Sequence, residues 1–243
     1  MTLGTSRAEE VVGKLFDLEE ELPPELRDEI LSLGPEAVEP LVALLVRKED
    51  VWHRFIAFEC FHAAMLLAEL RPPGAAEVVT RRLERAILAT DEDQWVMDRL
   101  GVAAQRFGAD IVEPMLAAYA RAEVRGPARV MYAGLLSGIG VRDERIFQIV
   151  VAECEREPAF CGMLTEYGDP RGSAVALRAL EAAETSSPPD AFDWPELEPA
   201  FEAVATLGGQ LTLRLVWIRD TARAAWKRAR LARAIVEGRT ILD

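Results

Sequence analysis

The chain has 243 residues, of which 50% are hydrophobic and 28% are charged, and this composition excludes a globally disordered protein. Its net charge of −13 disfavours a general nucleic-acid binder and suits a basic partner. Ala, Leu, Glu and Arg are abundant and no long stretch alternates with period two, which predicts an all-α protein.

A sequence of helices can be followed from one end of the chain to the other. Ser6 and Glu9 form a capping-box pattern at the first helix, and its apolar stripe of Val11, Val12, Leu15, Phe16 and Leu18 is expected to face the core. Pro23-Pro24 begins the second helix. The stretch 51–70 is apolar nearly all round, so we expect its helix to be buried on most sides. We predict helices over 6–21, 24–33, 35–48, 51–70, 75–89, 94–107, 110–122, 127–139, 142–155, 158–166, 170–184, 196–206 and 211–237.

One short pattern recurs between these helices. The stretch 33–41, Leu-Gly-Pro-Glu-Ala-Val-Glu-Pro-Leu, returns at 107–115 as Phe-Gly-Ala-Asp-Ile-Val-Glu-Pro-Met, 74 residues later. A related copy lies between them at 71–79, and weaker copies follow at 140–143 and 167–171. In each clear copy a Gly ends one helix and an acidic residue opens the next. The spacing predicts a helical repeat protein.

This pattern, together with Gly168-Asp-Pro-Arg-Gly-Ser-Ala-Val-Ala-Leu177, resembles bacterial HEAT-like repeats, including the type found in phycobilin lyases. The resemblance covers residues of about 23–184. It implies an α-α superhelix of about five to six antiparallel helix pairs, in which the second helices line a concave face that binds another protein. The segment after 185 departs from the pattern, and the repeat spacing shortens along the chain.

The composition changes near residue 185. Residues 185–195 are rich in Pro and Ser and predict a linker between a repeat solenoid over 1–184 and a helical cap over 196–243. Residues 211–243 hold eight basic side chains against three acidic ones, a net charge of +5, which leaves −18 for the rest of the chain. The last helix is therefore predicted to be basic and amphipathic.

The cysteines and the N-terminus bear on the compartment. Cys60, Cys154 and Cys161 are odd in number and form no closely spaced pair, so we interpret them as core residues of a protein in a reducing compartment. The first residues show no secretory signal, and no run of about 18 uncharged apolar residues predicts a transmembrane span. We therefore expect a cytoplasmic protein.

No set of residues predicts catalysis. His53, Cys60 and His62 cannot converge from one helix, because His62 lies about 200° from Cys60 around the axis. The signatures of zinc proteases, serine hydrolases and phosphate-binding loops are absent, and Asp91 and Asp93 are better explained as helix caps. We expect no catalytic, metal-binding or cofactor-binding residue, and no enzymatic activity.

The candidate partner-binding residues are basic or aromatic and lie on second helices or on the last helix. Helix 75–89 is expected to turn Arg81, Arg82 and Arg85 toward solvent. The alternative for all candidates is an ordinary solvated face. On the last helix the arginines could instead form i, i+4 pairs or cover the acidic solenoid, with Leu215, Trp217 or Ile218, Ala222, Ala225, Trp226 and Leu231 packed inward. The functional alternatives for this helix are a partner-docking helix, a membrane-surface segment and a nucleic-acid contact. The candidates are Arg47, Arg81, Arg82, Arg85, Tyr119, Arg121, Arg223, Lys227 and Arg230.

Three functions stay open on the sequence. The preferred one is a non-catalytic scaffold or adaptor that binds a protein of unknown identity in a concave groove. The second is a repeat-fold enzyme or chromophore-lyase-like factor, which needs a ligand-sized cavity holding an acid or a base. The third is a HEAT-like nucleic-acid-binding protein, which the acidic charge disfavours. The oligomeric state does not follow from the sequence.

Overall fold

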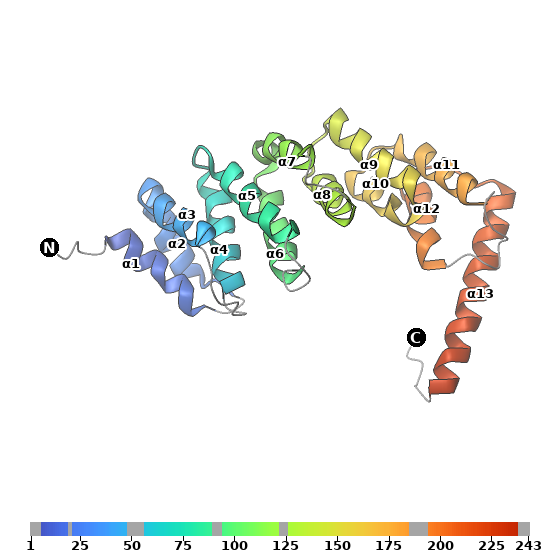
Figure 1. Cartoon of the computed structure of the whole chain (residues 1–243), viewed down its shortest axis with the longest axis horizontal. Helices are drawn as coiled ribbons and strands as arrows, with labels where there is room; N and C mark the ends of the chain where they lie inside the picture. Colours follow the sequence, from blue (N-terminus) through green and yellow to red (C-terminus); the bar gives the residue numbers. More distant parts are fainter. Residues whose placement is uncertain are drawn as a thin grey trace. The chain divides into compact units, whose positions relative to one another are not determined.

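The computed structural model describes residues 6–18, 21–47, 56–88, 94–121, 126–184 and 194–237, and these residues form helices and turns with no strand (Figure 1). The prediction of an all-α protein is therefore confirmed for this part of the chain. The α-helices are α1 (Arg7–Gly13), α2 (Pro24–Ser32), α3 (Val38–Val46), α4 (Ile56–Leu70), α5 (Ala75–Leu88), α6 (Gln94–Arg106), α7 (Val112–Tyr119), α8 (Pro127–Ser137), α9 (Glu144–Arg156), α10 (Gly162–Tyr167), α11 (Gly172–Glu184), α12 (Trp194–Thr206) and α13 (Leu213–Glu237). Short 3-10 segments are η1 (Lys14–Asp17), η2 (Gly34–Ala37), η4 (Gly108–Ile111) and η5 (Pro158–Cys161).

The helices group into two compact units, residues 1–141 and 142–243. The predicted division into 1–184, 185–195 and 196–243 stays a prediction. Most of the predicted linker lies outside the described residues, although its last two residues, Trp194 and Pro195, already belong to α12. Asp91 and Asp93, predicted as helix caps, also lie outside them.

The N-terminal unit consists of two layers of helices. α4 contacts α2 and α6 within one layer, while α5 contacts α3 and α7 within the other. α4 and α3 pack across the layers, as do α5 and α6. Leu45, Leu67, Leu83 and Leu100 are fully buried between them, and each such side chain contributes about 1.5–3 kcal/mol before entropy is subtracted. α4 is buried on most sides, as its composition predicts.

The turns between paired helices share one backbone conformation. Gly34 and Gly108 have φ of +55° and +58°, in the left-handed region where a Cβ is unfavourable. Each is followed by a 3-10 turn and then by a helix with Glu in its first turn. Gly74, Gly140, Gly168 and Gly208 also have positive φ. The recurring sequence pattern thus corresponds to a recurring turn.

The C-terminal unit repeats the layered arrangement. α9 contacts α11, and α10 contacts α12, while α11 packs on α12 across the layers. α13 packs on α12 through its N-terminal half, where Leu215, Ile218 and Ala222 are buried. Beyond Ala222 no described residue of α13 is buried, and in Figure 1 this half of the helix extends past the other described helices of its unit.

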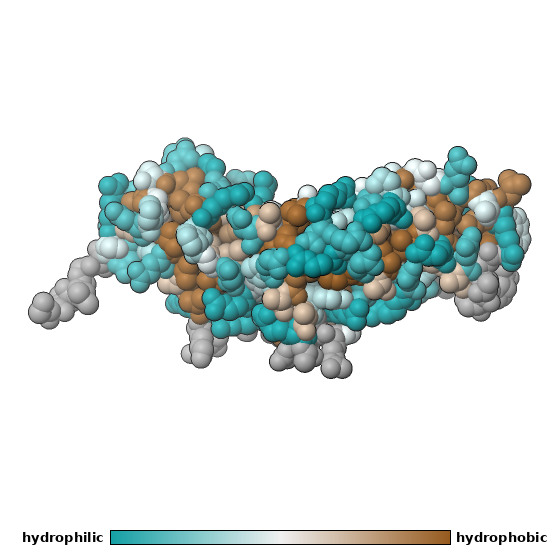
Figure 2. Space-filling model, turned by 90° about the horizontal axis from the view of Figure 1, so that it is seen from above, coloured by the Kyte–Doolittle hydropathy of each residue, from teal (hydrophilic) through white to brown (hydrophobic). Residues whose placement is uncertain are grey.

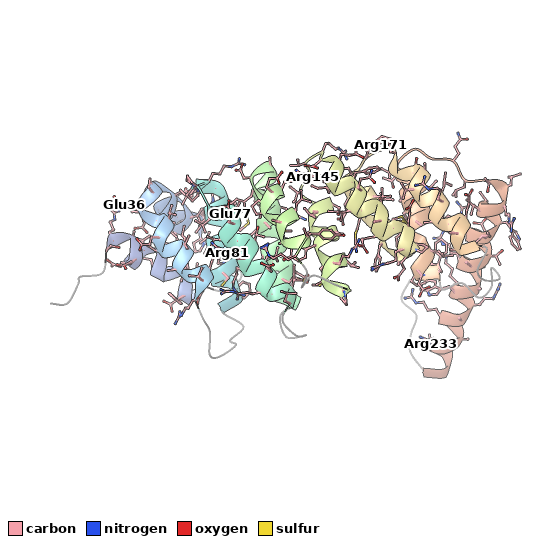
Figure 3. All side chains as sticks on the ribbon, turned by 45° about the horizontal axis from the view of Figure 1, so that its top comes forward. Glu36, Glu77, Arg81, Arg145, Arg171 and Arg233 are labelled. Carbon is pink, nitrogen blue, oxygen red and sulfur yellow. A yellow bond between two sulfur atoms is a disulfide. The ribbon has the colours of Figure 1, made fainter. Side chains whose placement is uncertain are left out.

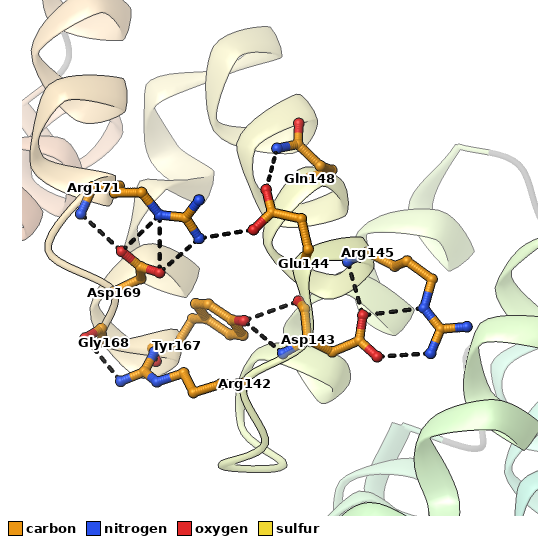
Figure 4. Close-up of polar contacts among 9 residues, drawn as sticks. All are labelled: Arg142, Asp143, Glu144, Arg145, Gln148, Tyr167, Gly168, Asp169 and Arg171. Carbon is orange, nitrogen blue, oxygen red and sulfur yellow. Dashed lines mark hydrogen bonds and ion pairs between the residues drawn. The ribbon is translucent and has the colours of Figure 1, made fainter.

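Two turns of the C-terminal unit carry the same Asp-X-Arg motif (Figure 4). Asp143 accepts hydrogen bonds from the backbone N–H of Arg145 at 2.8 Å and from its guanidinium at 2.7 and 3.1 Å. Asp169 accepts the equivalent bonds from Arg171 at 2.8–3.1 Å. Each Asp therefore holds the start of a helix and an Arg at the same time.

Arg171 and Arg142 join these two turns to each other. Arg171 Nη2 donates to Glu144 Oε2 at 2.9 Å, and its guanidinium lies 4.1 Å from the centre of the Phe147 ring. Arg142 donates to the carbonyl oxygens of Tyr167 and Gly168. The Tyr167 hydroxyl donates to the Asp143 carbonyl and accepts from its N–H, both at 2.9 Å. The hydrogen bonds from the arginines lower the pKa of Asp143, Asp169 and Glu144.

The cysteines correct one expectation. Cys154 and Cys161 form a disulfide, with their Cα atoms 4.6 Å apart, whereas Cys60 is buried and belongs to no disulfide among the described residues. All three are core residues, as predicted, but the pairing was not expected. Pro158 ends the preceding helix and the turn η5 folds the chain back, which brings together two residues seven apart. The argument from unpaired cysteines to a reducing compartment therefore fails.

In the described residues, no helix has both the length and the apolar character needed to cross a bilayer.

The conformation of the repeat turn is tested by a pair of substitutions in one unit. Gly108→Ala should destabilise the N-terminal unit by about 1 kcal/mol, because Ala pays for φ of +58° while its Cβ meets no other atom. Gly13→Ala, at φ of −58° with equally open surroundings, should stabilise it by about 0.5–1 kcal/mol. Urea unfolding of both variants measures the difference. Equal effects of the two substitutions would contradict the role given to the turn.

The contribution of the Asp-X-Arg turns should depend on pH. A carboxyl with a lowered folded pKa stabilises the fold above its unfolded pKa, about 3.9 for Asp and 4.3 for Glu, and this stabilisation is lost as the pH falls through the folded pKa. Arg171→Gln should therefore lower the unfolding midpoint of the C-terminal unit at pH 7, and this effect should shrink progressively as the pH falls below about 4. Arg178→Gln is the control, because Arg178 is equally exposed, at 56%, but among the described residues it pairs with Glu155 alone. Parallel pH profiles for Arg171→Gln and the unmodified chain would contradict this prediction.

Candidate functional site

The nine predicted partner-binding residues occupy different environments. Six belong to the N-terminal unit, at the end of α3, along α5 and at the end of α7. The other three lie on α13 in the C-terminal unit. The former are Arg47, Arg81, Arg82, Arg85, Tyr119 and Arg121, and the latter are Arg223, Lys227 and Arg230.

The arginines of α5 do not share one face. Arg81 and Arg85 are exposed, lie one turn apart, and form no ion pair with any described residue. Figure 3 shows Arg81 on α5. Arg82 is only 9% exposed, so the expectation that it faces solvent is wrong. Its Nε has no hydrogen-bond partner among the described residues. Position 82 falls on the packed side of the helix between Val79 and Leu83, which carries its aliphatic stem into the core.

The residues at the end of α7 are engaged within the unit. Arg121 forms a two-point ion pair with Glu84 of α5, at 2.9 and 3.1 Å. The guanidinium of Arg129, on α8, lies 5.5 Å from the centre of the Tyr119 ring. Tyr132 is fully buried, and this burial raises the pKa of its hydroxyl. The negative charge of Glu84 raises the same pKa to a smaller extent. Tyr119 and Arg121 therefore join α5, α7 and α8, and the charge of Arg121 is compensated.

A groove runs along the outer surface of the first helices. It has a volume of about 770 Å³ and lies between α1 with η1 on one side and η2 with α3 on the other. The residues of each wall are spaced three or four apart, so one face of each helix lines it. We name it the α1/α3 groove. It is lined by Ser6, Glu9, Val12, Gly13, Phe16, Glu36, Glu39, Pro40, Ala43, Leu44 and Arg47.

The two ends of the α1/α3 groove differ in charge. Glu9, Glu36 and Glu39 lie toward the N-terminal ends of its helices and are exposed. Glu9 closes the capping box predicted with Ser6, whereas neither Glu36 nor Glu39 forms an ion pair in the described chain. At the other end Arg47 stacks over Phe16, with its guanidinium 4.9 Å from the ring centre. Phe16 is 38% exposed, so the expectation that it faces the core is wrong.

A second, smaller hollow of about 320 Å³ lies at the turn between α4 and α5, beside η4. Arg71 and Asp110 approach to 3.5 Å across it, both more than half exposed. Arg71 has φ of 48°, which is uncommon for a residue other than glycine. The hollow therefore marks where successive repeat turns meet, and it holds one exposed ion pair.

The basic surface of α13 combines charge with cation–π contacts to aromatic rings. Arg223, Lys227 and Arg230 are three or four residues apart and lie on one side of the helix. Arg223 lies over Trp194 and Arg230 over Trp226, at 5.8 and 5.4 Å from the ring centres. None of the three forms an ion pair with a described residue. Figure 3 shows Arg233 on the same projecting half of the helix.

Packing along α13 follows the prediction only in part. Leu215, Ile218 and Ala222 are packed as expected, whereas Leu231 is 49% exposed and its predicted packing is wrong. Exposed apolar side chains also occur elsewhere: the face in Figure 2 shows hydrophobic residues between hydrophilic ones. Among the described residues, the large exposed ones are Phe16, Val46, Leu88, Val102, Leu213, Trp217 and Leu231.

The residues weighed for metal binding or catalysis are not assembled by the described part of the chain. No group of three His, Cys, Asp or Glu side chains there could hold a metal ion. Cys60 and His62 are buried in α4. His53, Asp91 and Asp93 lie outside the described residues.

Sequence reasoning missed the α1/α3 groove. Glu36 and Glu39 were interpreted through their place in the repeated turn, and Phe16 as part of a buried stripe. The available signal was the Ser6, Glu9, Gly13 and Phe16 spacing, which places all four on one side of the first helix. This spacing predicts a groove only when η2 and α3 are known to lie beside the same face.

Comparison with protein-family models, with curated proteins and with solved structures finds no match to this chain.

Proposed function

We propose that the protein is a non-catalytic scaffold of HEAT-like repeats, arranged as an α-α superhelix, that binds another protein in the α1/α3 groove. The layers α2, α4, α6 and α3, α5, α7, with one type of glycine turn between them, support this architecture. The conclusion depends most on the α1/α3 groove, which is long, open and lined by both apolar and acidic side chains.

The groove has the features of a helix-binding surface. An amphipathic helix places its apolar face in a groove through residues three, four and seven apart. Phe16, Ala43 and Leu44 offer apolar contacts, while Glu36 and Glu39 would attract a basic flank. The partner segment is accordingly a basic amphipathic helix. The acidic charge of the whole chain favours the approach of such a segment.

The groove also explains why α5 is not the centre of the site. Arg81 and Arg85 would repel a basic segment, and Arg82 is buried. Arg47 has a different role, because its stacking on Phe16 closes one end of the groove. Of the predicted candidates in the N-terminal unit, Arg47 is therefore the one that takes part in this proposal.

A charge-reversal experiment tests the groove. Glu36→Lys with Glu39→Lys should weaken partner binding about tenfold or more, because two attractive charges become repulsive at the acidic end. The control is Glu10→Lys with Glu25→Lys, which changes the net charge equally, also in the first turns of helices, but outside the groove.

The partner is captured by a photo-crosslinking amino acid at Ala43, in cells that express the protein, with the same group at the exposed Asp28 as reference. We expect one protein crosslinked at Ala43, lost in the Glu36→Lys, Glu39→Lys variant and kept in the control variant. Equal crosslinking at both positions, or equal loss in both variants, would refute the groove as the binding site.

A further inference from the structure

The apolar stripe of α13 extends beyond the part of the helix that packs on the C-terminal unit. Leu215, Ile218 and Ala222 are buried against the C-terminal unit, and the same helical spacing continues through Trp226 and Ala229. No described residue after Ala222 is buried. In the second half of the helix, residues 223–237, the same face thus continues, but no described element packs on it. We name it the projecting half of α13.

The charge of the projecting half specifies what it can bind. Arg223, Lys227 and Arg230 flank the stripe, and Arg228 and Arg233 add to the basic surface. These five side chains form no ion pair in the described chain. Two copies of this helix would repel each other. The complementary surface must therefore be acidic at its edges and apolar at its centre.

The α1/α3 groove has this complementary character. Its acidic end holds Glu9, Glu36 and Glu39, and its apolar lining includes Val12, Ala43 and Leu44. The wall from Ser6 to Phe16 extends about 15 Å, and the projecting half of α13 about 21 Å, at 1.5 Å per residue. Trp226 is the large anchor that such a contact needs, since interface energy concentrates in buried aromatic residues.

We propose that the projecting half of α13 in one copy of this chain binds the α1/α3 groove of a second copy. This inference rests on the proposed function of the groove and names its occupant. The two surfaces are different, so the contact is head-to-tail. Such a contact leaves a free groove at one end and a free helix at the other, and copies add until a ring closes or an open chain forms.

Three variants of the full-length chain test the charge complementarity. Lys227→Glu with Arg230→Glu alters the helix, Glu36→Lys with Glu39→Lys alters the groove, and the third variant carries all four changes. Sedimentation velocity over a range of protein concentrations should show self-association of the unmodified chain, weakened about tenfold or more in each double variant. The quadruple variant should recover association, because exchanged charges attract again.

The anchor is tested without a change of charge. Trp226→Ala should weaken self-association about tenfold. Trp217→Ala is the matched control, since Trp217 is 58% exposed on the opposite side of the same helix and should leave association unchanged. High salt should weaken association of the unmodified chain through screening.

The outcomes separate this inference from the proposed function. A monomeric unmodified chain, or a quadruple variant no better than the double variants, would overturn the second copy as the occupant. The proposed function would then survive if another protein is crosslinked at Ala43 and lost with Glu36→Lys, Glu39→Lys. Crosslinking of Ala43 to the chain itself, lost with Trp226→Ala and kept with Trp217→Ala, would support both. Recovery of nucleic acid or lipid on α13 in place of a second copy would overturn the inference.

Discussion

The reversal of the chain at a left-handed glycine is the constraint on which the helix pairs depend. A helix that ends at Gly34 or Gly108 is followed at once by a tight 3-10 turn, so the next helix starts beside the one before it. Few residues are available to adjust the packing, which makes the register of adjacent helices a property of the turn. The Glu residues that follow in the first turn complement the helix dipole.

In the C-terminal unit the same constraint is met by polar contacts rather than by apolar packing alone. The turns at Gly140 and Gly168 are followed by Asp-X-Arg, and Arg171 reaches back to the preceding motif through Glu144. These residues have lowered carboxyl pKa values, which in another setting would suggest catalysis. Here every carboxylate is held by an arginine at the start of a helix, so the pKa shifts report structural ion pairs.

The fold could be predicted further than the site. Turn glycines, capping residues and 3.6-residue periodicity are local signals, and they predicted the order of the described helices. The first helix, predicted over 6–21, ends earlier, because α1 stops at Gly13 and the chain continues as the 3-10 segment η1 to Asp17. The Cys154–Cys161 disulfide was missed because its closure depends on the path of η5 after Pro158. Arg82 was wrongly expected to face solvent, because its residue type is the same as that of the exposed Arg81 and Arg85 although it lies on the apolar side of the helix. The α1/α3 groove needs two helices that are separated in sequence by α2, and periodicity within either one does not reveal their contact.

The separation of charge along the chain gives the molecule an electrical asymmetry that its net charge of −13 conceals. The segment 213–237 has seven basic residues and two acidic ones on a helix whose outer half is exposed. On ion-exchange columns the protein should therefore bind to resins of either charge. A cationic resin would retain the acidic majority, and an anionic resin would hold the same molecule by α13 at neutral pH. Its retention depends on whether α13 or the acidic remainder of the chain binds the resin, so the isoelectric point is a poor guide to its purification.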